Sequence, residues 1–215
     1  MVVTWDQRGN GRSYESFDPA GITLEAAVND LVELANHLRV RFDEQKVYLL
    51  GESWGTIAAV LAAQQHPELF HALISSGQMV DVADTDQLIY QDLLVWADAH
   101  DQGLATQLRG FGPPPYASLW SYSVFLENYP RIEGAYTPPQ SYRDRHTKSG
   151  VGFFGVMGSE LPPVQKMNLF RGLMDTFDVL YPQLQHLDFR RDVPTLQCPS
   201  TSSTAPTNCA VEASR

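Results

Sequence analysis

The apolar positions of this chain follow a helical period in some stretches and form short continuous runs in others. Across residues 23–41 they recur every three or four positions, which predicts an amphipathic helix with Thr23 as its N-cap. Residues 46–51 and 70–77 are short apolar runs that end in glycine, a pattern typical of strands buried on both faces of a parallel sheet. The alanine-rich residues 56–66 lie between these runs and predict a second helix.

The order strand, helix, strand is typical of right-handed βαβ units, so we expect an α/β fold with a parallel sheet. Residues 1–4 are a further β-rich run and predict one more strand. From Asp81 the alternation stops, and helical stretches at residues 84–100 and 167–177 are separated by segments rich in proline and glycine. We therefore predict three parts: 1–80 as part of the core, 81–191 as a helical cap or lid, and 192–215 as the start of a core strand and a tail.

Composition and charge narrow the range of functions. The formal net charge is -10 and no concentrated basic face is present, so we expect no nucleic-acid partner. The chain lacks a membrane-length apolar run and the regions of a signal peptide, which predicts no membrane partner and a cytoplasmic location. Both cysteines, Cys198 and Cys209, lie near the end of the sequence and the histidines lack ligand spacing, so we expect neither a metal nor another cofactor. The sequence does not predict an oligomeric state.

The segment Gly51-Glu52-Ser53-Trp54-Gly55 follows a predicted strand and precedes a predicted helix. A Gly-x-Ser-x-Gly segment alone occurs by chance in about one chain in fifteen of this length, but the strand-turn-helix setting is the one required for a nucleophile elbow. We therefore predict Ser53 as a nucleophile, with Gly51 and Gly55 leaving room for a sharp turn and the backbone N–H of Trp54 donating to an oxyanion. The alternative is a glycine-bounded turn with an idle serine.

The elbow, together with Asp6-Gln7-Arg8-Gly9-Asn10-Gly11-Arg12-Ser13, resembles the proline iminopeptidase branch of the α/β-hydrolases over about residues 2–196. The resemblance implies a partial α/β-hydrolase sheet with a helical cap insertion, and a Ser-His-acid hydrolase acting on small amides, peptides with a free N-terminus, or esters. It also implies an oxyanion loop before the Asp-Gln-Arg-Gly turn, and an acid and a histidine after the cap. The chain begins after that loop and has no histidine beyond Leu196, so we expect a truncated and weakly active or inactive hydrolase. The alternative is a non-catalytic remnant or a small-ligand-binding module.

The tail after Gln197 is mostly Ser, Thr, Pro and Ala without periodicity, which fits a disordered end. A second hypothesis is a frameshift. If the serines use TCN codons, reading two bases further on permits Val-Pro-Val-Tyr-Leu-Val-His-Gly-Ala-His-Glu-Leu, a buried strand with an acid just beyond it.

Other polar residues have less specific interpretations. Asp6 and Arg8 are expected to brace their turn. Three acids of the predicted cap are candidates to bind a substrate amine, with solvated surface as the alternative: Glu127, Glu133 and Glu160. The histidines are expected to have structural or surface roles, because none lies where the resemblance places a catalytic base: His37, His66, His71, His100, His146 and His186.

Overall fold

The computed structural model describes residues 1–132 and 162–203, which belong to two compact units. We call Met1–Ile22 with Asp86–Pro182 the helical unit, and Thr23–Thr85 with Gln183–Arg215 the sheet unit. This division differs from the predicted domain boundaries, because the first 22 residues group with the helices of the insertion. Each unit is described by itself.

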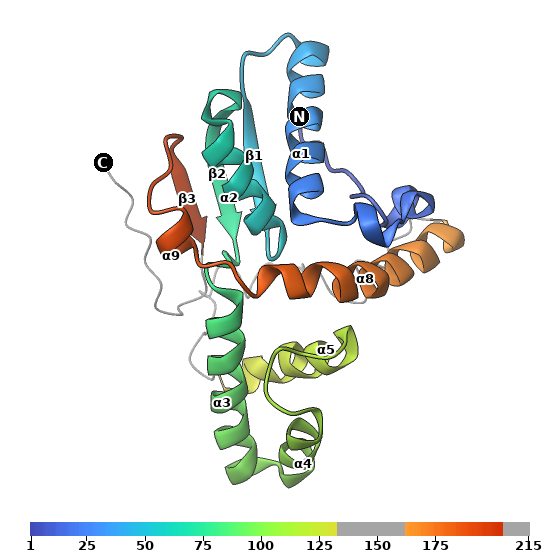
Figure 1. Cartoon of the computed structure of the whole chain (residues 1–215), viewed down its shortest axis with the longest axis vertical. Helices are drawn as coiled ribbons and strands as arrows, with labels where there is room; N and C mark the ends of the chain where they lie inside the picture. The colour runs from blue at the N-terminus through green and yellow to red at the C-terminus, as the bar shows by residue number, and fades with distance from the viewer. Residues whose placement is uncertain (133–161, 204–215) are drawn as a thin grey trace, which may run out of the picture. The chain divides into compact units, whose positions relative to one another are not determined.

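The sheet unit contains a three-stranded parallel sheet in the order β1-β2-β3, with β1 at Val47–Glu52, β2 at Phe70–Ser76 and β3 at Ser200–Ser203 (Figure 1). Leu50 lies opposite Ile74, and Ile74 lies opposite Thr201. The predicted α/β class and the parallel sheet are therefore confirmed.

Among the described residues, helices α1 and α2 pack in the sheet unit, with α2 in direct contact with the sheet. Helix α1 spans Leu24–Phe42 and is capped as predicted, with the Thr23 hydroxyl accepting a hydrogen bond from the Ala26 N–H at 3.0 Å. Helix α2 spans Gly55–Gln65, packs against α1, β1 and β2, and is followed by the 3₁₀ turn η3 at Pro67–Leu69. The side chains of Ile57, Phe70 and Leu73 are each 1% exposed and form the centre of this core.

Two predictions about strands were wrong. The first is the strand at residues 1–4, which have no regular structure because no described segment pairs with them and their backbone groups lack ladder partners. The second is burial on both faces of the strand predicted at residues 46–51: β1 is covered on one face only, and Tyr48 and Leu50 are 71% and 67% exposed. Among the described residues, the helices cover the opposite face, which carries Gly51.

The chain leaves the sheet unit after Thr85 and returns to it at Gln183, ahead of α9 at Phe189–Asp192. The segments near these two points are bonded together, since the Phe189 N–H donates to the Val80 carbonyl at 2.9 Å. Arg190 adds ion pairs with Asp81 at 2.6 Å and Asp188 at 2.9 Å. These contacts fasten the base of the insertion within the sheet unit.

The helical unit confirms both helical stretches predicted for the insertion and extends them. Helix α3 spans Val82–His100, with its first turn in the sheet unit, and helix α8 spans Pro163–Leu184. The other helices in the described part of this unit are short: η1 (Gly11–Ser16), η2 (Pro19–Gly21), α4 (Gln102–Phe111), α5 (Leu119–Asn128) and η4 (Tyr129–Arg131). None of the helices in the described ranges combines the length and apolar character needed to cross a membrane.

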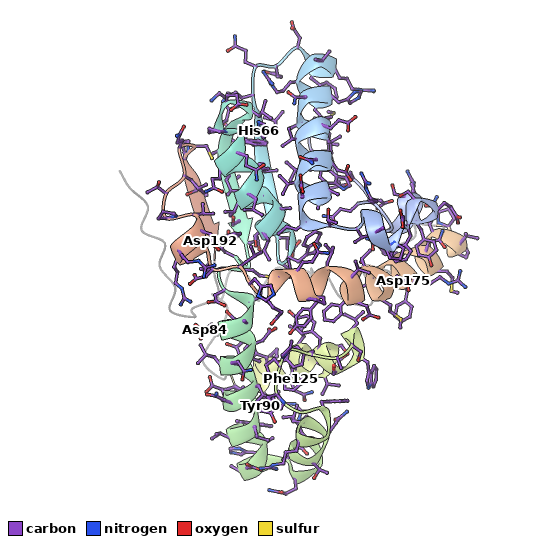
Figure 2. All side chains as sticks on the ribbon, in the orientation of Figure 1. His66, Asp84, Tyr90, Phe125, Asp175 and Asp192 are labelled. Atoms are coloured by element: carbon purple, nitrogen blue, oxygen red, sulfur yellow. The ribbon has the colours of Figure 1, made fainter. Side chains whose placement is uncertain are left out.

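An aromatic cluster surrounds a buried carboxylate in the helical unit. Asp86 of α3 is 4% exposed and accepts a hydrogen bond from the Tyr181 hydroxyl at 2.6 Å. The Tyr181 oxygen in turn accepts from the Tyr116 N–H at 3.2 Å, so its own proton is committed to Asp86. Burial raises the pKa of Asp86 to about 6, although the Tyr181 bond acts in the opposite direction. Figure 2 shows Tyr90 and Phe125 beside each other in this cluster, with ring centroids 5.7 Å apart.

Replacing Asp86 with asparagine is expected to remove a pH dependence from the stability of the helical unit. The pKa of Asp86 rises from 3.8 to about 6 on folding, so the folded state favours the neutral carboxyl. The contribution of Asp86 to stability is therefore greatest below pH 3.8 and is lost as the pH rises through about 6, by on the order of 3 kcal/mol relative to Asp86→Asn. Urea unfolding of both proteins across this pH range, followed by circular dichroism, checks this. Parallel stability curves contradict it.

Candidate active site

Ser53 lies at the junction between β1 and α2. Strand β1 ends at Glu52 and helix α2 begins at Gly55, so only Ser53 and Trp54 make the turn. Ser53 has a φ of +51°, in the left-handed region that L residues other than Asn and Asp rarely adopt, and it is exposed. A residue in this conformation costs of the order of 1–3 kcal/mol and persists only where its surroundings hold it.

Three hydrogen bonds hold the backbone of Ser53. Its N–H donates to the Ser76 carbonyl at the end of β2, at 2.9 Å. Its carbonyl accepts from the N–H of Thr56 at 2.9 Å and from the Thr56 hydroxyl at 2.6 Å. The groups on both sides of the strained φ angle are therefore tied, one to the neighbouring strand and one to the first turn of α2.

The two glycines of the elbow have different surroundings. A Cβ added to Gly51 lies 2.9 Å from both the Gly55 carbonyl oxygen and the Thr56 Cα, distances that real Cβ atoms essentially never show. A Cβ added to Gly55 meets no described atom within 4 Å outside its chain neighbours and the backbone of its own helix. The steric reason predicted for both glycines therefore applies to Gly51, where the helix start passes close to the strand, and not to Gly55.

Trp54 and Glu52 flank Ser53. Trp54 is the N-cap residue of α2 and makes no side-chain capping bond, so its backbone N–H lies at the positive end of the helix dipole. This is a suitable location for a donor to a developing oxyanion. Glu52 is exposed and lies opposite Ser76 in the parallel register.

The described histidines have contacts away from the elbow, and none is hydrogen-bonded to Ser53. His66 lies 3.3 Å from the Glu68 carboxylate, His71 packs on the Tyr48 ring at 5.1 Å, and His100 bonds the Trp96 carbonyl at 2.8 Å. Two more are exposed, on α1 and after α8: His37 and His186. His146 lies outside the described residues.

The remaining predicted residues fall in several places. The Asp6 carboxylate accepts from the Arg12 N–H at 2.9 Å, which confirms that it braces its turn; the Arg8 carbonyl accepts a bond from the Asn10 side chain in the same turn. Glu127 is exposed on α5, whereas Glu133 and Glu160 lie outside the described residues. In residues 1–132 and 162–203, no group of three or more His, Cys, Asp or Glu side chains has an arrangement that fits a metal ion.

The sequence does not single out two buried polar residues. Thr56 is the first residue of the predicted alanine-rich helix, and the signal that identifies it is its place directly after the elbow, where a hydroxyl can bond back to the turn. Asp86 lies in a predicted helix and is buried at 4% exposure, and no local signal in the sequence indicates this.

The unequal surroundings of the two glycines predict unequal effects of alanine. Gly51→Ala is expected to destabilise the sheet unit by on the order of 2 kcal/mol, because the added methyl group meets backbone atoms that cannot rotate away. Gly55→Ala is the matched control and is expected to change stability by less than about 1 kcal/mol, since it adds a helix-favouring residue in open space. Urea unfolding of the two variants compares them directly. Equal losses of stability contradict the geometry described for the elbow.

Comparison with known proteins places these features in a family. Residues 1–109 match the family Hydrolase_4, described as serine aminopeptidase, S33. The chain is 27% identical over 201 residues to the probable aminopeptidase YbaC of Bacillus subtilis (strain 168), a match that covers 92% of this chain and 61% of the relative.

Two further relatives match over shorter lengths. Human serine hydrolase BPHL is 35% identical over 102 residues, covering 45% of this chain and 33% of BPHL. A proline iminopeptidase of Lactobacillus acidophilus (strain ATCC 700396 / NCK56 / N2 / NCFM) is 36% identical over 80 residues, covering 36% of this chain and 26% of that enzyme. The chain thus spans less than two thirds of the length of each of these relatives. The family match covers more than half of the chain, and with the parallel sheet and the elbow it identifies the chain as a member of the serine aminopeptidase S33 family, in the proline iminopeptidase-like branch of the α/β-hydrolases.

Proposed function

We propose that this protein is a serine hydrolase with Ser53 as its nucleophile. The observation that carries the proposal is the exposed Ser53 at a φ of +51°, between a parallel strand and the start of a helix. A turn of this kind lifts the hydroxyl clear of the sheet. The serine aminopeptidase family match and the relative named as a serine hydrolase support the same chemistry.

In the proposed reaction, the Ser53 oxygen attacks a substrate carbonyl carbon, the carbonyl oxygen becomes negatively charged, and the hydroxyl proton passes to a base. The Trp54 N–H donates to the oxyanion at the end of α2. As the tetrahedral intermediate collapses, the base returns the proton to the leaving group, which departs as an amine or an alcohol and leaves an acyl group on Ser53. Water then attacks the acyl group and releases a carboxylic acid and the free Ser53 hydroxyl. None of the described histidines is hydrogen-bonded to Ser53, and three of them have other partners, so we expect proton removal from Ser53 to be the slow step.

The proposed substrates are small amides, peptides with a free N-terminus, and esters. The relatives named as an aminopeptidase and as a proline iminopeptidase support the peptide class. A small molecule or short peptide is thus the proposed partner, and a cytoplasmic location remains a prediction.

A fluorophosphonate probe tests the assignment of Ser53. We expect slow labelling of the 215-residue chain, at a rate that climbs steadily with pH instead of levelling near the pKa of a histidine, about 6.5. Mass spectrometry of the digest should locate the label on Ser53. Ser53→Ala should abolish it, whereas Ser76→Ala, which keeps the backbone carbonyl that bonds to Ser53 and removes only the neighbouring hydroxyl, should leave it unchanged. Labelling that survives Ser53→Ala overturns the proposal.

A pair of substrates tests the peptide class. At high protein concentration, small aryl esters should be hydrolysed first, because their good leaving groups demand least of a general acid. Among aminoacyl arylamides, a free N-terminus should be preferred over an N-blocked analogue, and Ser53→Ala should remove both activities. Equal rates for free and blocked arylamides contradict the proposal of an aminopeptidase and remain compatible with an esterase.

The alternative is a non-catalytic remnant or a small-ligand-binding module. It is favoured by the absence of a histidine bonded to Ser53 among the described residues, where His66, His71 and His100 have other partners. The labelling experiment separates the two functions: an elbow that never reacts with the probe, even at high pH, supports the binding module.

The hypothesis of a shifted reading frame after Gln197 stays a proposal, now with a structural correlate. Strand β3 covers Ser200–Ser203 and pairs with β2 in parallel. These are the positions at which the shifted frame permits Val-Tyr-Leu-Val, residues that favour strands far more than serine does. The coding DNA decides the question, since a stop codon in the shifted frame within these positions rejects it.

A further inference from the structure

The side chain of Thr56 is buried beneath the elbow and uses its hydroxyl fully. Thr56 is 0% exposed. Its Oγ1 donates to the Ser53 carbonyl at 2.6 Å and accepts from the N–H of Met79 at 3.1 Å. A hydroxyl has one proton to donate, so the two bonds assign its orientation without ambiguity.

The two partners of Thr56 lie on different segments of the sheet unit. Ser53 is the strained residue of the elbow, and Met79 belongs to the loop that follows β2. The next residue, Val80, accepts the Phe189 N–H at 2.9 Å, at the point where the chain returns from the insertion. The Thr56 hydroxyl is therefore the side-chain link between the elbow and the loop from which the insertion departs.

Removing this hydroxyl changes both ends of the link. The Ser53 carbonyl keeps its bond from the Thr56 N–H but loses the shorter of its two bonds. The Met79 N–H loses its acceptor, and a part-buried donor without a partner costs more than the bond itself contributed. Valine has nearly the shape of threonine and isolates this effect from any change in packing.

We propose that Thr56 is a positioning residue that holds Ser53 in its reactive orientation by tying the Ser53 carbonyl to the loop after β2. The proposal rests on Ser53 as the nucleophile. Thr56 acts through the Ser53 backbone and touches no substrate.

Amide hydrogen exchange tests the link without relying on any activity. In the full chain, the Met79 N–H should exchange more slowly than an unstructured amide. Thr56→Val should speed the exchange of Met79 by about tenfold to a hundredfold, and Thr56→Ser, which keeps the hydroxyl, should restore it. Thr23→Val is the matched control: it removes a threonine hydroxyl that caps α1 in the same unit, so it lowers stability without touching the elbow.

The labelling rate of Ser53 tests the positioning role. Per folded molecule, Thr56→Val should react with a fluorophosphonate about tenfold more slowly than the parent chain, with rescue by Thr56→Ser and no change for Thr23→Val. If the Met79 amide is unprotected in the parent chain, the link is absent and the proposal fails even if Thr56→Val does not fold. If Thr56→Val labels as fast as the parent chain, the positioning role is rejected. If the parent chain does not label at all, the assignment of Ser53 fails, and the exchange data still decide whether the link exists.

Discussion

The left-handed backbone of Ser53 is the constraint on which the geometry of the elbow depends. An L residue at a φ of +51° is strained, and its three backbone hydrogen bonds offset that strain by tying it to β2 and α2. The need to hold Ser53 in this conformation also restricts the residues around it. A side chain at position 51 would push the start of α2 away from β1, and with it the Thr56 groups that bond to Ser53. The parallel pairing of β1 with β2 places the Ser76 carbonyl where the Ser53 N–H needs an acceptor.

Much of the sheet unit was predictable because each of its elements carries a local signal. The Thr23 cap, the apolar spacing of α1 and the glycine near the end of β1 are signals that concern residues within a few positions of themselves. The elbow was predictable for the same reason, since its glycine and its serine lie within one turn. The φ value of Ser53 and its hydrogen bond to Ser76 could not be predicted, because they depend on a strand more than twenty positions away.

The failures share one physical cause, which is that periodicity shows which residues favour burial and not what covers them. Tyr48 and Leu50 alternate with covered positions of β1, yet they are exposed because no described helix packs over them. The β-rich residues 1–4 have strand propensity without a strand to pair with. Asp86 looked like an ordinary polar position of a helix, and its burial follows from Tyr181, which lies 95 positions away.

The geometry of the elbow and its reactivity depend on different parts of the molecule. The conformation of Ser53 requires Gly51, Thr56 and Ser76, all within the sheet unit, and these contacts hold whether or not a base is present. Reactivity requires, in addition, a group that removes the hydroxyl proton, because a serine hydroxyl is a weak nucleophile on its own. A well-formed elbow therefore identifies the fold and the family more directly than it identifies an active enzyme. The pH dependence of labelling at Ser53 reports on the base alone, whereas amide exchange at Met79 reports on the geometry alone. The two measurements together therefore distinguish an active hydrolase from a protein that has the elbow geometry without a base.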